Sequence, residues 1–175
     1  IFLSGEVTYV IEGKSYILKP WDILLVGKYD IHQPIISSSV PYERIILWLN
    51  PRFLDAYKKN DCDLQSCFTL ARERKMNMIR LNKKDIPSIK QTLDDLEEAI
   101  KDRSFGCDIL KNALFIQLMV KINRLFFGMD IKKKMDDVRY DPRIEQIISY
   151  INDNLESDLS IEHISNKFYL NRYYL

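Results

Sequence analysis

The chain has 175 residues, a length that allows one large domain or two small ones. Its 26 basic and 25 acidic residues give a net charge of +1, so the chain as a whole lacks the charge excess that attracts nucleic acids or membranes. Any DNA-binding surface must therefore be local. No apolar run reaches the roughly 18 residues of a membrane span, and no signal peptide opens the chain, so we expect a cytoplasmic protein without a membrane partner.

The cysteines and the two ends of the chain carry further information. Cys62, Cys67 and Cys107 are odd in number, and their spacing suits no zinc site, so we expect reduced thiols. The first residue is Ile1, inside a strand-like run, and Leu175 falls within an amphipathic pattern. We therefore expect a fragment of a longer protein, truncated at both ends.

Residues 1–50 alternate short apolar runs with turn signals, a pattern typical of strands. Residues 7–11 alternate with period two, and Gly13 marks a turn before residues 15–18, which predicts a hairpin. Further strands are expected at residues 23–26, around Ile31, and as one long strand over residues 42–49. Many short strands with frequent turns favour a sandwich or a small barrel.

Four short segments of this half resemble segments of a known family: Gly5-Glu6-Val7, residues 16–25, Asp30-Ile31-His32, and residues 41–44. Their order and spacing resemble the cupin barrel at the front of bacterial AraC/XylS-type transcription regulators. That family usually has Gly before Asp22, where this chain has Trp21, and often Pro near position 27, where it has Gly27. The resemblance covers residues 1–57 and implies a partial cupin-like effector-sensing barrel.

The same resemblance raises the question of a metal. Enzymatic cupins hold one with His-x-His and Glu in a first motif and His in a second, and His32 matches only the second-motif His. Glu6 lies seven residues before Gly13, which superficially fits the end of the first motif. The better register makes Gly5 the motif glycine and places the ligands before Ile1. One His without partners cannot form a three- or four-ligand site, so we expect no metal, no cofactor and no catalytic residue.

An effector would bind in the mouth of such a barrel. Aromatic rings can stack on a sugar ring and Arg can hold a carboxylate, so we expect a sugar or a small acid. The alternative is that these side chains fill the core, with Arg44 paired to Glu43 or Asp22. The candidate pocket residues are Tyr9, Trp21, His32, Arg44 and Trp48.

Residues 58–128 are interpreted as a connector followed by a helical dimerisation region. A short helix opens at Pro51, and residues 60–83 are expected to hold short helical or extended pieces. From Asp85, apolar residues at steps of three and four predict a helix capped by Asp85 or Ser88.

The next predicted helix, over residues 107–127, is apolar around most of its circumference, so it must be buried on nearly all sides. One face would pack on the barrel and the first helix. The other would meet a second subunit, since AraC-like regulators commonly dimerise through such helices; the alternative is that a missing part of the chain covers it. The dimerisation candidates are Ile89, Leu93, Leu96, Ile100, Leu114, Leu118 and Leu125.

Residues 129–140 are a charged linker, and residues 141–175 predict three helix starts, capped by Asp141, Ser160 and Asn171. The short turn before the third start is typical of a helix-turn-helix. The string resembles the opening of the AraC-type DNA-binding domain, with Ser165 where the family has Ala and Asn171 where it has Ser. The resemblance implies that Asn171, Arg172 and Tyr173 contact DNA. One turn of recognition helix cannot supply the roughly 600–1,000 Å² of a specific interface, so this chain should bind DNA weakly or not at all.

Together these patterns predict an α+β fold: a partial cupin-like β-barrel, a helical dimerisation hairpin, and the first helices of a helix-turn-helix domain. The expected protein is a sequence-specific, DNA-binding transcription regulator of AraC type, of which this chain is mainly the effector-sensing and dimerisation part, and not an enzyme. Two alternatives stay open: a cupin-type metal-dependent isomerase or dioxygenase, and a ligand-free dimerisation module. Metal analysis tests the first, and thermal-shift screening with sugars, sugar acids and aromatic acids tests the second.

Overall fold

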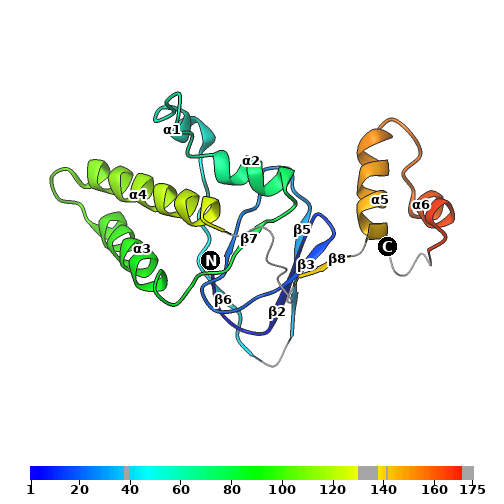
Figure 1. The fold of residues 1–175 in the computed structure, drawn as a ribbon, viewed down its shortest axis with the longest axis horizontal. Coiled ribbons are helices and arrows are strands. Elements are labelled where there is room, and N and C mark those ends of the chain that lie inside the picture. Colours follow the sequence, from blue (N-terminus) through cyan, green and yellow to red (C-terminus); the bar gives the residue numbers. More distant parts are fainter. Residues whose placement is uncertain (38–39, 130–137, 141, 171–175) are drawn as a thin grey trace.

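The computed structural model describes residues 1–37, 40–129, 138–140 and 142–170 (Figure 1). In these residues the strands form three antiparallel sheets, in the orders β1-β6, β5-β2-β3-β8 and β4-β7, and the barrel is not closed. The strands are β1 (Phe2–Ser4), β2 (Val7–Ile11), β3 (Lys14–Ile17), β4 (Ile23–Leu24), β5 (His32–Ile36), β6 (Glu43–Arg44), β7 (Met78–Ile79) and β8 (Val138–Tyr140).

The predicted hairpin is confirmed as β2 and β3, with Ile11 opposite Lys14. Its two turn residues, Glu12 and Gly13, both adopt positive φ, at 48° and 74°. That combination defines a tight turn whose twist matches the right-handed twist of the flanking strands. The hairpin buries Ile11 and Tyr16 in a small core beneath the sheet.

The long strand expected over residues 42–49 is wrong. The chain pairs only with the short strand β1 there, so the ladder ends at Arg44 and no regular structure follows before Pro51. The apolar alternation still has a role, because Ile45, Leu47 and Leu49 pack against the main core while Ile46 and Trp48 are exposed. Every second residue of 45–49 therefore packs against the core, although this segment belongs to no strand.

Four helices follow: α1 (Pro51–Asp55), α2 (Ser66–Glu73), α3 (Ile86–Lys101) and α4 (Cys107–Phe127). They confirm the helices expected at Pro51 and over 85–100 and 107–127. Asp85 occupies the cap position of α3, but its side chain makes no capping hydrogen bond. Ser88 lies inside the helix, where its carbonyl accepts a hydrogen bond from the Thr92 hydroxyl. Neither side chain therefore caps the helix as expected.

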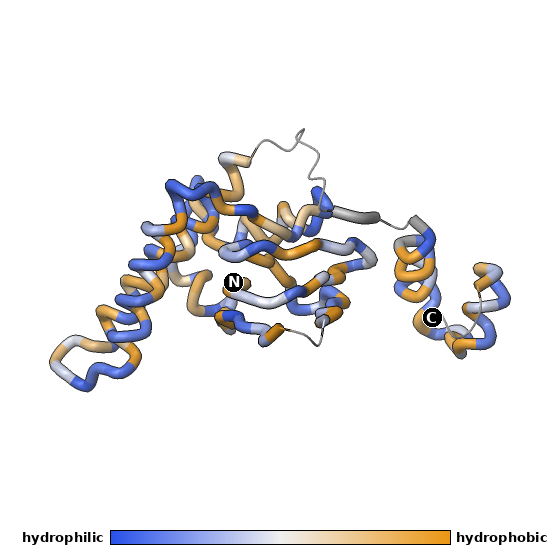
Figure 2. Tube along the Cα trace, turned by 90° about the horizontal axis from the view of Figure 1, so that it is seen from below, coloured by the Kyte–Doolittle hydropathy of each residue, from blue (hydrophilic) through white to orange (hydrophobic). Residues whose placement is uncertain are grey.

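The main core runs from the strands into these helices. Ile23 and Leu25 of the barrel are buried in the same cluster as residues of α2, α3 and α4. The boundary expected at residues 57 and 58 therefore does not separate two cores. In Figure 1 the α3–α4 hairpin projects from one end of the sheets, and Figure 2 shows apolar residues mixed with polar ones as far as its tip.

Two buried polar side chains fasten this core. The Asn123 amide of α4 donates to the carbonyl oxygens of Leu64 and Met119 and accepts from the Cys67 N–H, which ties α2 to α4. Arg80 donates from Nε and from a terminal nitrogen to the two carboxylate oxygens of the buried Asp22, at 3.0 and 2.8 Å. Such two-point contacts hold two segments in one orientation.

The C-terminal part contains α5 (Pro142–Asp153) and α6 (Ile161–Phe168), at the end of the sheets away from the α3–α4 hairpin (Figure 1). Ser160 caps α6 as predicted, since its hydroxyl accepts from the His163 N–H. Tyr150 fastens α5 to α6 through a 2.9 Å hydrogen bond to His163 and an edge contact with Phe168. The caps predicted at Asp141 and Asn171 lie outside the described residues. Among the helices that the structure describes, none combines the length and apolar character needed to cross a bilayer.

Candidate effector site

The open side of the incomplete barrel gathers polar and aromatic side chains from neighbouring strands. β2 pairs with β5 so that Ile11 lies opposite His32 and Tyr9 opposite Pro34, which puts Tyr9 and His32 on the same face of the sheet. Their rings stack, with centroids 6.2 Å apart and an angle of 10° between the planes. This pair forms the floor of the candidate site.

Tyr42 and Arg44 complete the group from the segment containing β6. The Arg44 guanidinium lies 4.8 Å from the centre of the Tyr42 ring and donates a 3.0 Å hydrogen bond to its hydroxyl. Burial raises the pKa of the Tyr9 hydroxyl, nearby Tyr42 raises it further, and Arg44 lowers it. These influences place all three in electrostatic reach of one another, and we call Tyr9, His32, Tyr42 and Arg44 the Tyr9 cluster.

The chemistry of the Tyr9 cluster suits an oxygen-rich ligand. His32 Nδ1 lies 2.8 Å from the Asp30 carbonyl oxygen. A carbonyl only accepts, so Nδ1 carries the proton of the neutral ring and Nε2 is left as an acceptor. Arg44 is exposed and has five N–H donors, more than Tyr42 uses. The cluster therefore offers a cation, a phenol and a ring nitrogen on one open face.

Two of the five expected pocket residues lie elsewhere. Trp48 is 92% exposed, and Trp21 packs against the main core. Trp21 has φ 73°, in the left-handed region that favours glycine, which explains why the resembling family usually has Gly before this Asp. Asp22 pairs with Arg80, so the alternative pairing with Arg44 is not formed.

Tyr42 was missed from the sequence. Its signal was the string that also contains Arg44, since residues two apart on an extended segment point to the same side. The pattern does not reveal that this segment crosses back beside β1, where the Phe2 ring lies 6.0 Å from that of Tyr42.

The residues expected to form the dimer have different surroundings. Ile89, Leu93, Leu96 and Leu118 are buried in the core of their own chain, so they cannot meet a second subunit while that core is intact. Leu114 and Leu125 are partly buried against it, and Ile100 is exposed. The residues predicted from helical periodicity lie mostly on the inner face of the hairpin, because apolar residues repeat most regularly on that face.

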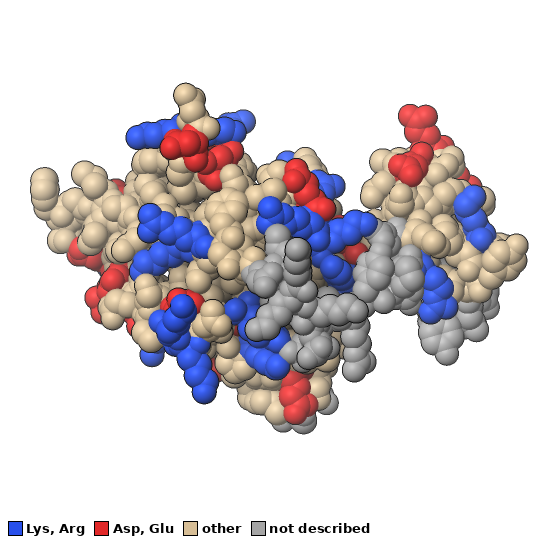
Figure 3. Space-filling view, in the orientation of Figure 1, with Lys and Arg blue, Asp and Glu red and all other residues tan. Residues whose placement is uncertain are grey.

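The predicted DNA contacts, Asn171, Arg172 and Tyr173, lie outside the described residues. On the face shown in Figure 3, Lys and Arg side chains are interspersed with Asp and Glu over the sheets and over α5 and α6. Among the residues with described positions, no three His, Cys, Asp or Glu side chains come together as a metal site would require.

A comparison with known families matches residues 1–119 to the AraC-like ligand binding domain, and the chain belongs to that family. The matched stretch runs from β1 into α4 and points to a regulatory role rather than an enzymatic one. Neither a curated protein nor a solved structure matches the chain.

Proposed function

We propose that this chain is the effector-sensing and dimerising part of an AraC-type transcription regulator. The support is the family membership of residues 1–119, followed by two helices fastened to each other in the segment that resembles the opening of an AraC-type DNA-binding domain. The intact regulator would contact DNA through the segment that begins at Asn171, and the chain itself would bind DNA weakly.

The observation that carries the proposal is the Tyr9 cluster. Small-molecule sites combine aromatic surface with a few placed polar groups, and the cluster holds a cation, two phenols and an imidazole. Arg44 favours a small acid over a neutral sugar, because a guanidinium holds a carboxylate with two hydrogen bonds. The Tyr9 and His32 rings supply a flat surface on which the body of the ligand can stack.

The dimer would use the outer face of the α3–α4 hairpin. Apolar side chains are exposed at its tip: Ile100 at the end of α3, Phe105 in the connecting loop, and Ile109, Leu110 and Ala113 in the first turns of α4. We call these residues the outer stripe: Ile100, Phe105, Ile109, Leu110 and Ala113. An exposed apolar patch of this kind marks a protein interface, and a second copy of the same hairpin offers a complementary surface under two-fold symmetry.

Effector binding would alter how the two DNA-binding units are presented. The route runs through β3, which pairs with β2 of the Tyr9 cluster on one side and with β8, just before α5, on the other. Such coupling requires that the effector bind one arrangement of these units more tightly than another.

The experiment is a thermal-shift and calorimetric screen of the protein against sugars, sugar acids and aromatic acids. We expect one class of acid to raise the unfolding midpoint, and Arg44→Gln and Tyr9→Ala each to weaken its binding about tenfold or more. Trp48→Ala is the matched control, because this exposed aromatic lies outside the cluster and should leave binding unchanged. Absence of binding across the panel, or equal binding by Arg44→Gln, would refute the sensor proposal and favour a ligand-free dimerisation module.

A further inference from the structure

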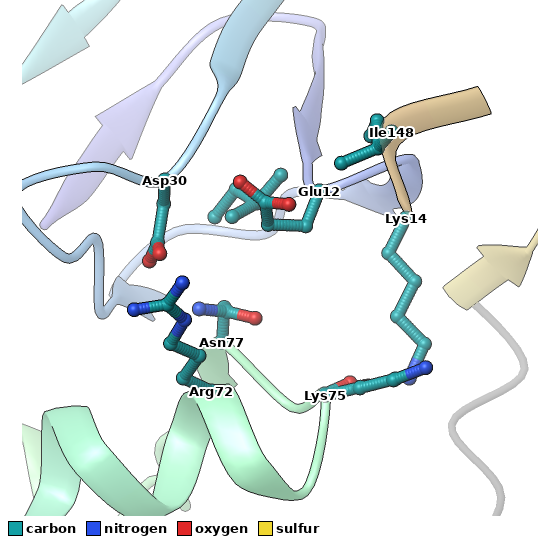
Figure 4. Close-up of a pocket in the computed structure, with 8 residues that line it drawn as sticks. Glu12, Lys14, Asp30, Arg72, Lys75, Asn77 and Ile148 are labelled. Atoms are coloured by element: carbon teal, nitrogen blue, oxygen red, sulfur yellow. The ribbon is translucent and has the colours of Figure 1, made fainter. Parts of the chain in front are cut away.

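A hollow borders the Tyr9 cluster through Asp30, the hydrogen-bond partner of His32, and lies where the β2–β3 turn, the end of α2 and α5 approach one another (Figure 4). Its volume is about 190 Å³, below the roughly 300–1,000 Å³ of pockets for drug-sized molecules, so only a small ligand fits. The hollow joins the sensor to the C-terminal helices, since Ile148 of α5 is part of its wall.

Opposite charges face each other across one end of this hollow. Figure 4 shows the Asp30 carboxylate and the Arg72 guanidinium directed toward one another, with the Asn77 amide beside them. They are too far apart to form an ion pair, and neither forms one with any other described residue. Among the residues that the structure describes, neither charge therefore has a counter-ion.

The burial of the Asp30 carboxylate makes this arrangement energetically unfavourable. The residue is only 7% exposed, and its carboxylate accepts a 2.7 Å hydrogen bond from the Gly27 N–H. A buried carboxylate without a cation is destabilising, because the lost hydration is replaced by one backbone hydrogen bond alone. A ligand that brings a positive charge to Asp30 would remove this penalty.

The remaining walls define the rest of the ligand. Ile11 and Ile148 provide apolar surface from the sensor and from α5. Asn77 is buried and donates from its amide nitrogen to the Leu25 carbonyl, and in Figure 4 its amide oxygen points away from Asp30 and Arg72. An ammonium group would therefore meet the Asp30 carboxylate at this end, while a carboxylate would meet Arg72.

We propose that this hollow is a second ligand site, specific for a small apolar α-amino acid. Its ammonium group binds Asp30, its carboxylate binds Arg72, and its side chain packs against Ile11 and Ile148. Because one wall belongs to α5, the bound amino acid holds the C-terminal helices against the sensor. The site adds a second input beside the Tyr9 cluster, to which it is joined by the hydrogen bond between His32 and Asp30.

The test is isothermal titration of the protein with L-leucine and two analogues that each lack one charge. The analogue 4-methylpentanoate has no ammonium, and 3-methylbutylamine has no carboxylate. We expect L-leucine to bind at least about tenfold more tightly than either, since each charged contact contributes separately. Equal binding of L-leucine and one analogue would overturn the zwitterion assignment, and no binding of L-leucine would overturn the site.

Substitutions of the lining residues test where L-leucine binds. Arg72→Gln and Asp30→Asn should each weaken L-leucine binding by about tenfold or more, and Ile148→Asn should weaken it if α5 forms the wall. Asn keeps an acceptor for the Gly27 N–H, and Arg72 is exposed, so both variants should fold. The matched controls, Arg52→Gln and Asp61→Asn, alter exposed charges elsewhere and should have no effect.

One further variant separates this proposal from the sensor proposal. Arg44→Gln should leave L-leucine binding unchanged while it weakens acid binding at the Tyr9 cluster. If Arg44→Gln abolishes L-leucine binding and Arg72→Gln does not, the amino acid occupies the Tyr9 cluster, and the second site is refuted while the sensor proposal stands.

Discussion

Cys67 is the most sheltered of the three thiols. It is fully buried in the main core beside Leu64, whereas Cys62 is exposed, and all three cysteines are free, in keeping with the reduced thiols expected from their number. Burial raises the pKa of the Cys67 thiol from 9.0 to about 12. At pH 8 roughly one such thiol in ten thousand is ionised, and only the thiolate reacts readily with alkylating reagents.

Iodoacetamide at pH 8 should therefore modify Cys62 rapidly and leave Cys67 unmodified in the folded protein. Peptide mass spectrometry over a time course gives the two rates, and we expect them to differ by about 100-fold or more. A sample unfolded in urea is the control, in which both cysteines should react. Comparable rates without denaturant would show that Cys67 is not held in this core.

Other single residues show what local sequence can predict. Ser160 caps α6 because a hydroxyl three residues before a backbone N–H needs no distant partner. Tyr9 and His32 stack on each other because their strands pair, whereas their role in an effector site stays a prediction. Arg80, by contrast, reaches Asp22 from 58 residues away, and no local pattern announces that pair.

For the α3–α4 hairpin, local sequence predicted the two helices but not which of their faces would be buried. Its helical period was plain in the sequence, and the bounds of α3 and α4 agree with it closely. The face used inside the chain and the face left outside could not be separated, because α4 is apolar on most sides. Packing against α3 and α2 separated the two faces by burying Leu118, Met119, Ile122 and Phe126.

The outer stripe should consequently control dimerisation. Ile109→Asp places a charge in the proposed interface, and we expect it to raise the dimer dissociation constant about tenfold or more, measured by sedimentation equilibrium. Thr69→Asp introduces the same charge at an exposed position of α2 and serves as the control.

Leu93→Ala tests the inner face of the hairpin. It should lower the free energy of unfolding by about 2–5 kcal/mol while leaving the dissociation constant of the folded dimer unchanged. A dissociation constant insensitive to Ile109→Asp but raised by Leu93→Ala would show that the inner face forms the interface after all.

Strand β8 connects the sheet of the sensor to the C-terminal helices α5 and α6. This strand extends the sheet by pairing with β3, with Lys14 opposite Tyr140 and Tyr16 opposite Val138, and α5 begins two residues after it. Residues 129–140 were interpreted as a plain charged linker, yet residues 138–140 form part of the sensor sheet. The placement of the C-terminal helices thus depends on one edge-strand pairing.

Arg139→Pro should undo that pairing, because proline lacks the N–H and is poorly accommodated in a paired strand. Amide hydrogen exchange of β3 should become faster, whereas the free energy of unfolding should change by only about 1 kcal/mol, since β8 is the edge strand of its sheet. Arg139→Gln keeps the N–H and should preserve the protection. Unchanged exchange of β3 in the proline variant would mean that β8 does not hold the C-terminal helices.

The sequence by itself determined the helices and the β2–β3 hairpin, since periodicity, turn chemistry and caps act over a few residues. Only the tertiary structure decided how far residues 42–49 pair, which face of α4 stays exposed, and where β8 adds to the sheet. It alone brought Asp30 and Arg72 to opposite sides of one hollow. These outcomes depend on contacts between segments distant in the chain, where neighbouring atoms rather than neighbouring residues decide what is buried.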